Sequence, residues 1–338
     1  MTGDPPTVSI VVPTFRRPGA LASTLAALLE LDYPPTRCEI VVVDDASDSA
    51  TEKVARELAD AEMPVSYRAQ PNSGAATARN HGARVADGEL LLFCDDDILL
   101  APSHLRLLRE TRDAFSDPLV NGALRFSRHV ETKLQETPFG RYRLALDRRF
   151  QAEADGRPLG QDCFQADLLT ACNLGVGRQQ FWDLGGFDEA FPYAGAEDQA
   201  LSLRASRSGT GLVRNHRIQV EHNDQALTFA QFCVREEKSA QTFAVLVDRF
   251  PDQAARPLFA RNSPLSRHDR PAVAARKLAK AALSRRPLLA GLHRVVGILE
   301  SRPVSERLLR RAYRVVVGLH IFRGVRTASR RFARRPIQ

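Results

Sequence analysis

The sequence predicts an α/β fold, with a mainly parallel sheet flanked by helices, and three observations indicate it. Short runs of β-branched residues alternate with helix-like patterns along the first hundred residues. Each run is nearly all apolar, as in strands that helices cover on both faces. Polar residues follow three of the runs, at 13–14, 44–45 and 95–97. Because open α/β sheets bind ligands at the carboxyl ends of their strands, these positions predict one polar crevice.

The expected elements follow one another closely. A strand at residues 8–12 ends at Pro13 and precedes a helix with leucines spaced by three and four. A strand at 40–43 leads into a helix from Ser49, and a strand at 64–67 leads into a small-residue helix at 74–86. The next strand, 90–93, ends in three aspartates before a helix near Pro102.

The second half of the chain is less regular. Glycines and prolines between residues 111 and 165 predict strands and loops there. A helix is expected from Glu197 and Asp198 to Gly209, and helical segments with interleaved Arg and Leu or Val follow residue 251.

The three consecutive carboxylates at residues 95–97 need an explanation. Like charges packed at a strand end are unfavourable unless they stay solvated or a cation lies between them. The triplet therefore indicates either a cation site or a solvated turn before the next helix. The other polar strand ends favour the cation site.

Composition limits the class and compartment of the protein. The residues are 43% hydrophobic and 26% charged, as in a globular protein, and no apolar run of about 18 residues predicts a membrane span. The first ten residues lack the pattern of a signal peptide, so we expect a cytoplasmic protein. Its five cysteines are scattered, odd in number and without a CxxC pair, which indicates neither a disulfide framework nor a thiolate zinc site.

Charge is distributed unevenly along the chain. Residues 251–338 hold 21 Lys and Arg against 4 Asp and Glu, whereas the other 250 residues hold 27 against 36. A basic C-terminal region on an acidic body predicts contact with an anionic surface, either membrane phospholipid or nucleic acid. The alternative is that these arginines only solvate helix faces. Few aromatic residues are interleaved with them, so we expect no nucleic acid.

Five motifs in order resemble the family 2 glycosyltransferases. They are VSIVVPTFRR, EIVVVDDASDS, NSGAATARNHGARVADGELLLFCDDD, NLGVGRQQFWDLGGFDEAF and GAEDQALSLR. The resemblance covers about residues 8–222 and implies a GT-A fold, which is Rossmann-like, with a mixed, mainly parallel sheet flanked by helices. We expect a transferase domain at 1–235, with a nucleotide-sugar half to about 110 and an acceptor half from 111. A basic helical region at 236–338 would follow it.

The resemblance also implies roles for individual residues. The residues placed along the nucleotide are Pro13, Thr14, Arg16, Asp45, Arg79, Asp95 and Asp96. Metal ligands would be Asp97, Asp95 and His222, with His216 a weaker candidate, and the cofactor would be Mg²⁺ or Mn²⁺. Asp198 would be the catalytic base and Glu197 would orient it. Acceptor contacts would come from Asn173, Trp182, Phe187 and Asp188, although Trp182 could equally belong to the core.

Together these residues imply a metal-dependent inverting transferase that moves one sugar from a nucleotide-diphosphate sugar to an acceptor hydroxyl. A divalent cation stabilises the departing diphosphate, and one base with direct displacement inverts the anomeric centre. The sequence has no QxxRW motif, so we expect transfer of one sugar rather than polymerisation. The expected acceptor is a glycan or lipid-linked glycan of bacterial cell-surface polysaccharide assembly, at the inner face of the cell membrane.

Two other function classes remain open from the sequence. A sugar nucleotidyltransferase has a related sheet, but VPTFRRPGA contains a single glycine where such enzymes carry a glycine-rich loop. A non-catalytic membrane or nucleic-acid adaptor would have no need to keep Asp95, Asp97 and Asp198 together.

Overall fold

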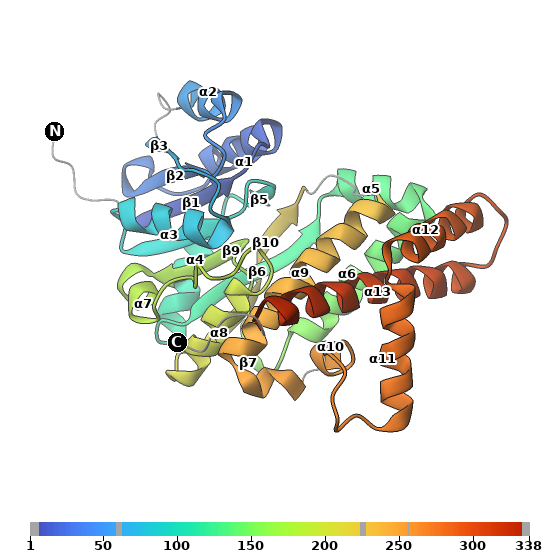
Figure 1. Cartoon of the computed structure of the whole chain (residues 1–338). Coiled ribbons are helices and arrows are strands. Elements are labelled where there is room, and N and C mark those ends of the chain that lie inside the picture. Colours follow the sequence, from blue (N-terminus) through green and yellow to red (C-terminus); the bar gives the residue numbers. More distant parts are fainter. Residues whose placement is uncertain (1–6, 59–62, 224–227, 256, 333–338) are drawn as a thin grey trace. The chain divides into compact units, whose positions relative to one another are not determined.

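The computed structural model of the chain describes residues 7–58, 63–223, 228–255 and 257–332, and Figure 1 shows its helices and strands. Its ten strands are β1 Val8–Thr14, β2 Cys38–Asp44, β3 Val65–Ala69, β4 Leu90–Cys94, β5 Ile98–Leu100, β6 Leu119–Phe126, β7 Pro158–Gly160, β8 Cys163–Gln165, β9 Asn173–Gly177 and β10 Leu212–His222. They form a sheet in the order β3-β2-β1-β4-β9-β6-β10-β8-β7, with β5 paired to β10. Neighbours among β1–β4 run parallel, whereas β9 is antiparallel to β4 and β6. The predicted mixed, mainly parallel sheet is confirmed.

The α-helices of the described residues are α1 Pro18–Leu29, α2 Ser49–Glu57, α3 Ala75–Val85, α4 His104–Ala114, α5 Arg128–Glu136, α6 Pro138–Ala154, α7 Arg178–Asp183, α8 Glu197–Arg207, α9 Phe229–Arg249, α10 Pro257–Ala260, α11 Pro271–Leu283, α12 Arg286–Glu300 and α13 Glu306–Phe332. The chain divides into two compact units. The first, the sheet unit, comprises residues 1–131, 147–189 and 197–225; the second, the helical unit, comprises 132–146, 190–196 and 226–338. Helix α9 runs across the domain boundary that we expected at residue 235.

Alternating side chains of the strands enter two hydrophobic layers, one on each face of the sheet. In β4, Leu90 and Leu92 pack with leucines of α1 and α4, while Leu91 and Phe93 pack on the other face with α3, α7 and α8. This alternation follows from the two-residue repeat of a strand. Both faces are covered, which explains why the strands read as continuous apolar runs.

The prediction for residues 111–165 was wrong in part, because α5 and α6 occupy 128–154. Pro138 and Gly140 had been interpreted as breakers. Pro138 instead opens α6, where the missing N–H costs nothing. Gly140 lies so close to the backbone of Leu134 that a Cβ atom would sit 1.9 Å from its carbonyl oxygen. The glycine is therefore required for close packing inside a helical segment.

The helical unit is built on its own core. Apolar and aromatic side chains of α6, α9, α12 and α13 form it, centred on Tyr313, whose ring packs against Phe139, Tyr142 and Phe229. Tyr313 is fully buried and donates a hydrogen bond to Glu300. Across the residues that the structure describes, no helix is both long enough and apolar enough to cross a membrane.

Candidate active site

The carboxyl ends of β1, β2 and β4 lie side by side at one edge of the sheet. Thr14 pairs with Asp44 across β1 and β2, and Val11 pairs with Phe93 across β1 and β4. The triplet that follows β4 thus lies next to the end of β1, and the hydroxyl of Thr14 donates to Asp96 Oδ2 at 2.6 Å. The structure therefore brings polar residues from the ends of these strands together at one edge of the sheet, and their role as a ligand site stays a prediction.

The three aspartates of the triplet face different partners. Asp95 accepts a hydrogen bond from Arg79 Nη2 at 2.7 Å. Asp96 is buried against Thr14 and Arg17, and Asp97 Oδ2 lies 2.7 Å from Arg17 Nη1. The repulsion within the triplet is relieved by two arginines, one on each side.

Asp96 and Asp97 are neighbours in the sequence, but their surroundings shift their pKa values in opposite directions. Burial raises the pKa of Asp96 to about 7, even though Arg17 and Thr14 favour its charged form. Burial would also raise the pKa of Asp97, but a hydrogen bond with His222 and the charges of His222 and Arg17 outweigh it and hold that pKa at about 2. Asp97 is therefore a permanent anion at physiological pH, as a ligand for a hard cation must be.

Arg79 joins the triplet to the start of α8. This buried side chain donates to Asp95 from one nitrogen and to Glu197 Oε1 from the other, at 2.8 Å. Its guanidinium lies over the ring of Phe187. Helix α3 can hold Arg79 here because Gly82, one turn away, packs where a Cβ atom would lie 2.3 Å from a methyl of Val11. The resulting chain Asp95–Arg79–Glu197 spans residues far apart in sequence.

Asp198 lies in the first turn of α8, beside this chain. It accepts backbone hydrogen bonds from Gln199 at 2.7 Å and from Ala171 at 3.3 Å. Burial raises the pKa of Asp198 above its ordinary range, and the neighbouring carboxylate of Glu197 raises it further. A carboxylate with a raised pKa is a stronger proton acceptor than an ordinary aspartate.

His222 ends β10 and approaches the triplet. Pairing of β10 with β5 places it opposite Ile98, and its Nε2 lies 3.5 Å from Asp97 Oδ1. Its ring stacks on Phe126 at 5.9 Å between centroids. His216, the weaker candidate, instead pairs with Asp155. Of the two histidines, His222 is the one that contacts an aspartate of the triplet.

The other residues expected along the nucleotide lie near the same edge. Asp45 is buried and accepts from Gln70 Nε2 and from the backbone of Ser73 and Gly74, so it holds the loop that precedes α3. Pro13 is buried in β1, and Arg16 is exposed with a φ of 54°. Their contacts with a nucleotide stay predictions.

The residues expected at the acceptor occupy varied surroundings. Asn173 is buried in β9 and accepts from the backbone of Gly122 at 2.7 Å, and Phe187 is buried between Phe93 and Phe181. Trp182 is half-buried, with the guanidinium of Arg84 5.6 Å from its ring. The negative charge of Asp188 acts on the guanidinium of Arg204. Their roles toward an acceptor stay predictions.

Sequence reasoning missed Arg17. The motif TFRRP contains two arginines, and only Arg16 was named; the structure directs Arg17 toward Asp96 and Asp97. Its place immediately before Pro18, which opens α1, is the signal that could have identified it. At the start of α1, Arg17 pairs with both Asp96 and Asp97.

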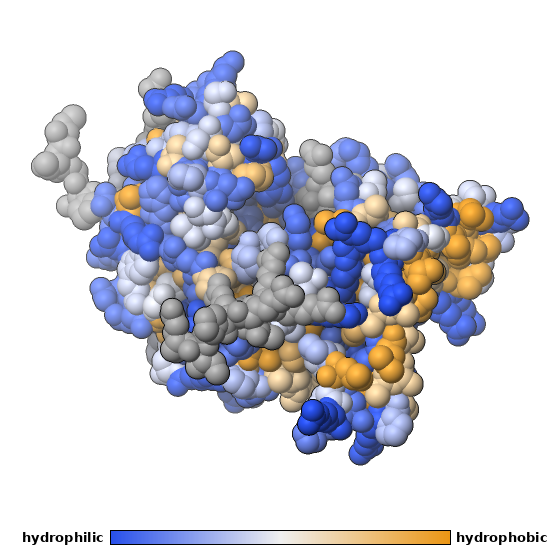
Figure 2. All heavy atoms as spheres, in the orientation of Figure 1, coloured by the Kyte–Doolittle hydropathy of each residue, from blue (hydrophilic) through white to orange (hydrophobic). Residues whose placement is uncertain are grey.

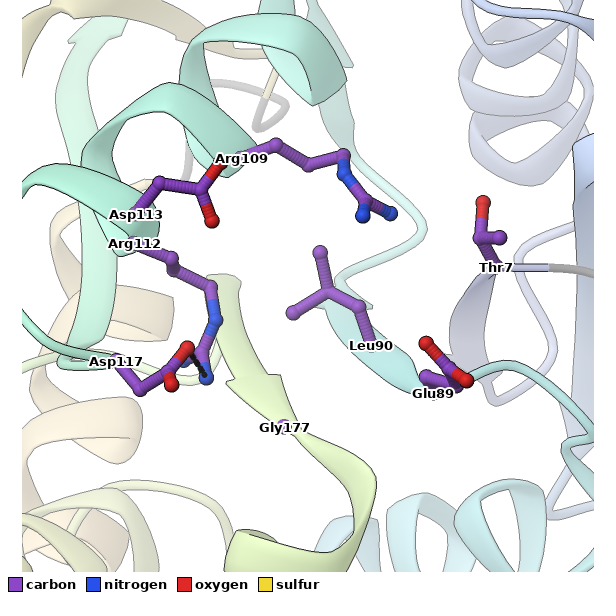
Figure 3. A pocket seen from close by; sticks show the side chains of 8 residues that line it. All are labelled: Thr7, Glu89, Leu90, Arg109, Arg112, Asp113, Asp117 and Gly177. Atoms are coloured by element: carbon purple, nitrogen blue, oxygen red, sulfur yellow. Dashed lines mark hydrogen bonds and ion pairs between the residues drawn. The ribbon is translucent and has the colours of Figure 1, made fainter.

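A hollow in the sheet unit lies away from the edge that carries the aspartates (Figure 3). Its volume is about 140 Å³, and its lining includes Thr7 before β1, Leu90 at the start of β4 and Gly177 at the end of antiparallel β9. These positions mark the opposite edge of the sheet. Arg112, which lines it, already pairs with Asp117 at 3.0 Å. This hollow is smaller than the roughly 300–1,000 Å³ typical of ligand sites.

Comparisons with known proteins show which fold the chain has and which family model matches part of it. A mannosyltransferase from Pyrobaculum calidifontis, solved in complex with GDP-Man and Mn²⁺, superposes with a TM-score of 0.59 and 18% identity, covering 94% of this chain and 87% of that one. The fold is accordingly the GT-A fold of nucleotide-sugar transferases. The model of glycosyl transferase family 2 matches residues 9–155. Residues 9–155, a little under half of the chain, are therefore similar to glycosyl transferase family 2.

Curated relatives match this chain over part of their length. Validoxylamine A glucosyltransferase of Streptomyces hygroscopicus subsp. limoneus is 28% identical over 234 residues, which are 62% of this chain and 49% of the relative. Glucosyl-dolichyl phosphate glucuronosyltransferase of Haloferax volcanii is 23% identical over 223 residues, which are 64% of this chain and 68% of the relative. The chain spans about half the length of the first relative.

Proposed function

We propose that the protein is a metal-dependent inverting glycosyltransferase that moves one sugar from a nucleotide-diphosphate sugar to an acceptor hydroxyl. The observation that carries this proposal is the ion-pair chain Asp95–Arg79–Glu197, which connects the acidic strand end to the helix that presents Asp198. A donor at the strand end and a base at the helix start are the two components of a direct displacement.

Asp198 is the base in this mechanism. It takes the proton of the acceptor hydroxyl as that oxygen attacks the anomeric carbon and the bond to the diphosphate breaks. Backbone donors from Gln199 and Ala171 fix its carboxylate, and Glu197 is positioned by Arg79. Because one displacement occurs at the anomeric carbon, its configuration inverts.

The residues at the strand end fit a hard divalent cation. Asp97 is held anionic, and Asp97 Oδ1 and His222 Nε2, at 3.5 Å, approach each other as two ligands of one ion would. Asp97 and His222 would hold Mg²⁺ or Mn²⁺, with Asp95 nearby; the similar mannosyltransferase binds Mn²⁺. The ion would neutralise charge on the departing diphosphate. Arg17, whose side chain is 49% exposed, contacts Asp97 on the same side and has room to turn toward a phosphate.

The acceptor in this proposal is a glycan or lipid-linked glycan at the inner face of a bacterial membrane. Residues 251–338 carry 21 basic residues against 4 acidic ones. Of the thirteen large exposed hydrophobic residues in the described part of the chain, nine also lie there: Leu265, Val273, Leu278, Leu283, Leu288, Val295, Ile298, Leu308 and Val315. Figure 2 shows hydrophobic surface interleaved with hydrophilic surface over α11 and α12. Apolar side chains surrounded by arginine are typical of surfaces that rest on anionic lipid.

A donor panel tests the reaction. Purified protein is incubated with UDP-, GDP- and dTDP-sugars, Mn²⁺ and a lipid-linked acceptor, and the nucleotide products are separated. Release of nucleoside diphosphate with an inverted glycoside supports the proposal. Release of pyrophosphate would identify a nucleotidyltransferase instead, and donor binding without any product would favour an adaptor.

A further inference from the structure

Three side chains from three different helices converge in the helical unit. Cys233 of α9, His293 of α12 and His320 of α13 place one potential ligand atom each within 4.8 Å of one another. Among the residues that the structure describes, this is the one group of three Cys, His, Asp or Glu side chains so compact. Cys233 and His320 are buried and His293 is partly exposed.

Helix periodicity directs each of the three residues into the same core. His320 follows Tyr313 and Val316 on the buried face of α13, and His293 lies between Leu289 and Val296 on the buried face of α12. A polar side chain at such a position needs a partner, because burying it unpaired is unfavourable. His293 and His320 pair with each other, and His320 also pairs with Glu237 of α9.

The distances suit a small ion with tetrahedral coordination. His293 Nε2 and His320 Nε2 are 3.0 Å apart. Around Zn²⁺, bonds of about 2.0–2.1 Å to nitrogen and about 2.3 Å to sulfur separate two nitrogens by roughly 3.3 Å and a nitrogen from the sulfur by roughly 3.6 Å. The two nitrogens therefore need to separate by only a few tenths of an ångström, and the sulfur of Cys233, within 4.8 Å of both, needs at most about one ångström of approach.

A second contact sets the tautomer of His320. Its Nδ1 lies 2.8 Å from Glu237 Oε2, and Arg323 Nε lies 3.3 Å from the other oxygen of the same carboxylate. Donation from Nδ1 to Glu237 leaves the lone pair of Nε2 directed at His293 and Cys233. A carboxylate on the far nitrogen of a histidine is the usual support of a metal ligand.

We propose that Cys233, His293 and His320 bind one Zn²⁺-type transition metal ion that links α9, α12 and α13. The thiolate and the two imidazoles occupy three tetrahedral positions, and water, reaching the partly exposed His293, takes the fourth. This ligand set favours Zn²⁺ over Mg²⁺ and Mn²⁺, which prefer oxygen ligands. The absence of a CxxC pair had argued against a thiolate zinc site, but the ligands come from three separate helices.

Proton balance follows from the surroundings of the ligands. Burial, with the charges of Glu236 and Glu237, raises the pKa of the Cys233 thiol to about 12, so the metal-free thiol is protonated. Burial and His320 lower the pKa of His293, which keeps that ring neutral. In the metal-free protein the proton between the two imidazoles lies on His293 Nε2, because His320 donates from Nδ1 to Glu237. Metal binding moves that proton to His293 Nδ1, forms two nitrogen–metal bonds and one sulfur–metal bond, and releases one proton from Cys233 to solvent.

The metal content of the full chain tests this inference. Protein stripped with chelator is equilibrated with Zn²⁺ in the presence of excess Mn²⁺, desalted and analysed by mass spectrometry; one tightly held zinc per chain is expected. With Co²⁺ as the probe, a thiolate-to-cobalt charge-transfer band should appear in the near ultraviolet. His293→Gln and His320→Gln should weaken zinc binding by at least about tenfold, Glu237→Gln by about 10–100-fold, and Cys233→Ser should abolish the cobalt band.

Matched controls separate this site from other thiols and imidazoles. Cys163→Ser changes another buried thiol, and His268→Gln changes an exposed histidine of the helical unit; both should bind like the wild type. Folded wild-type protein that holds no zinc and shows no thiolate band overturns the proposal, whether or not the variants fold. Zinc that persists in both Cys233→Ser and His293→Gln overturns it as well. Neither readout depends on sugar transfer.

Discussion

Asp198 combines two properties that a catalytic base needs: fixed position and high proton affinity. Its carboxylate is held by two backbone N–H groups at the start of α8, and burial with Glu197 raises its pKa. Replacing it with Asn preserves size but removes the proton acceptor. Asp198→Asn should lower turnover by at least about 10²-fold while donor affinity stays nearly unchanged. Steady-state rates and donor titration measure the two effects, and near-normal turnover would exclude Asp198 as the base.

The raised pKa of Asp198 also predicts a pH profile. A base works only when deprotonated, so kcat/KM should fall as the pH decreases through the pKa of the free enzyme. Because that pKa is raised, the decrease should begin well above the ordinary aspartate value of about 3.9. The residual activity of Asp198→Asn should lack this acid limb. If the limb survives in that variant, it belongs to another group such as Asp96, whose pKa is also raised.

Asp97 is the residue on which metal dependence should rest. Asp97→Asn removes the charge that His222 and Arg17 hold in place. Chelator should abolish activity of the wild type and Mn²⁺ or Mg²⁺ should restore it, whereas Asp97→Asn should require a metal concentration at least about tenfold higher. Metal titration of initial rates gives the comparison. Full activity of the wild type in excess chelator would show that the acidic strand end serves another purpose.

At the scale of elements, Arg79 connects α3, the end of β4 and the start of α8. Its side chain is 4% exposed and pairs with both Asp95 and Glu197. Arg79→Met removes the ion pair of Arg79 with the buried carboxylate of Glu197, and breaking a buried pair in this way costs about 3–5 kcal/mol. The free energy of unfolding, measured with denaturant, should fall by that amount.

The same helix offers a control for this prediction. Arg84 of α3 pairs with Glu189 at 3.0 Å, but its side chain is 55% exposed. Exposed pairs contribute about 0–1 kcal/mol, so Arg84→Met should change stability little. If both variants lost the same amount of stability, the ion pairs of Arg79 would contribute no more than the exposed pair of Arg84.

At the scale of the whole molecule, one region carries both the excess positive charge and most of the exposed apolar side chains. On α12, Leu288, Val295 and Ile298 are exposed, whereas Leu289 and Val296 face the core. A helix apolar on two sides needs a second apolar partner. Replacing the three exposed residues by Ser should weaken binding to anionic vesicles by at least about tenfold, because each buried aliphatic side chain contributes about 1.5–3 kcal/mol.

Vesicle co-sedimentation at low and high salt measures this binding. Each basic residue near an anionic surface adds on the order of 1 kcal/mol, so high salt should release the wild type. Phe150→Ser removes an exposed aromatic residue outside residues 251–338 and should have no effect. The membrane role is wrong if the triple variant binds vesicles as the wild type does. It is also wrong if the wild type does not bind anionic vesicles at low salt. Substitution is preferable to truncation, because α13 contributes Tyr313 to the core.

Much of the sheet unit was predictable because its signals are local. Apolar runs in the sequence predicted β1, β2, β3 and β4. The polar residues after three of these runs predicted that their side chains would gather at one edge of the sheet. Helices α5 and α6 were not predicted, because proline and glycine usually interrupt helices and the sequence contains Pro138 and Gly140 there. Pro138 is tolerated because it is the first residue of α6. Gly140 is needed because the backbone of Leu134 leaves no room for a Cβ atom.

The sequence by itself determined which chemistry is available at the crevice, since the acids at 95–97 and Asp198 follow directly from strand and helix ends. Tertiary structure alone decided which side chains meet. It directed Arg17 rather than Arg16 to the aspartates, placed Arg79 between Asp95 and Glu197, and brought Cys233 to His293 and His320. The physical reason is that a repeat of 2 or 3.6 residues fixes the face on which a side chain lies. Its partner depends on how separate elements pack, and those contacts join residues tens of positions apart.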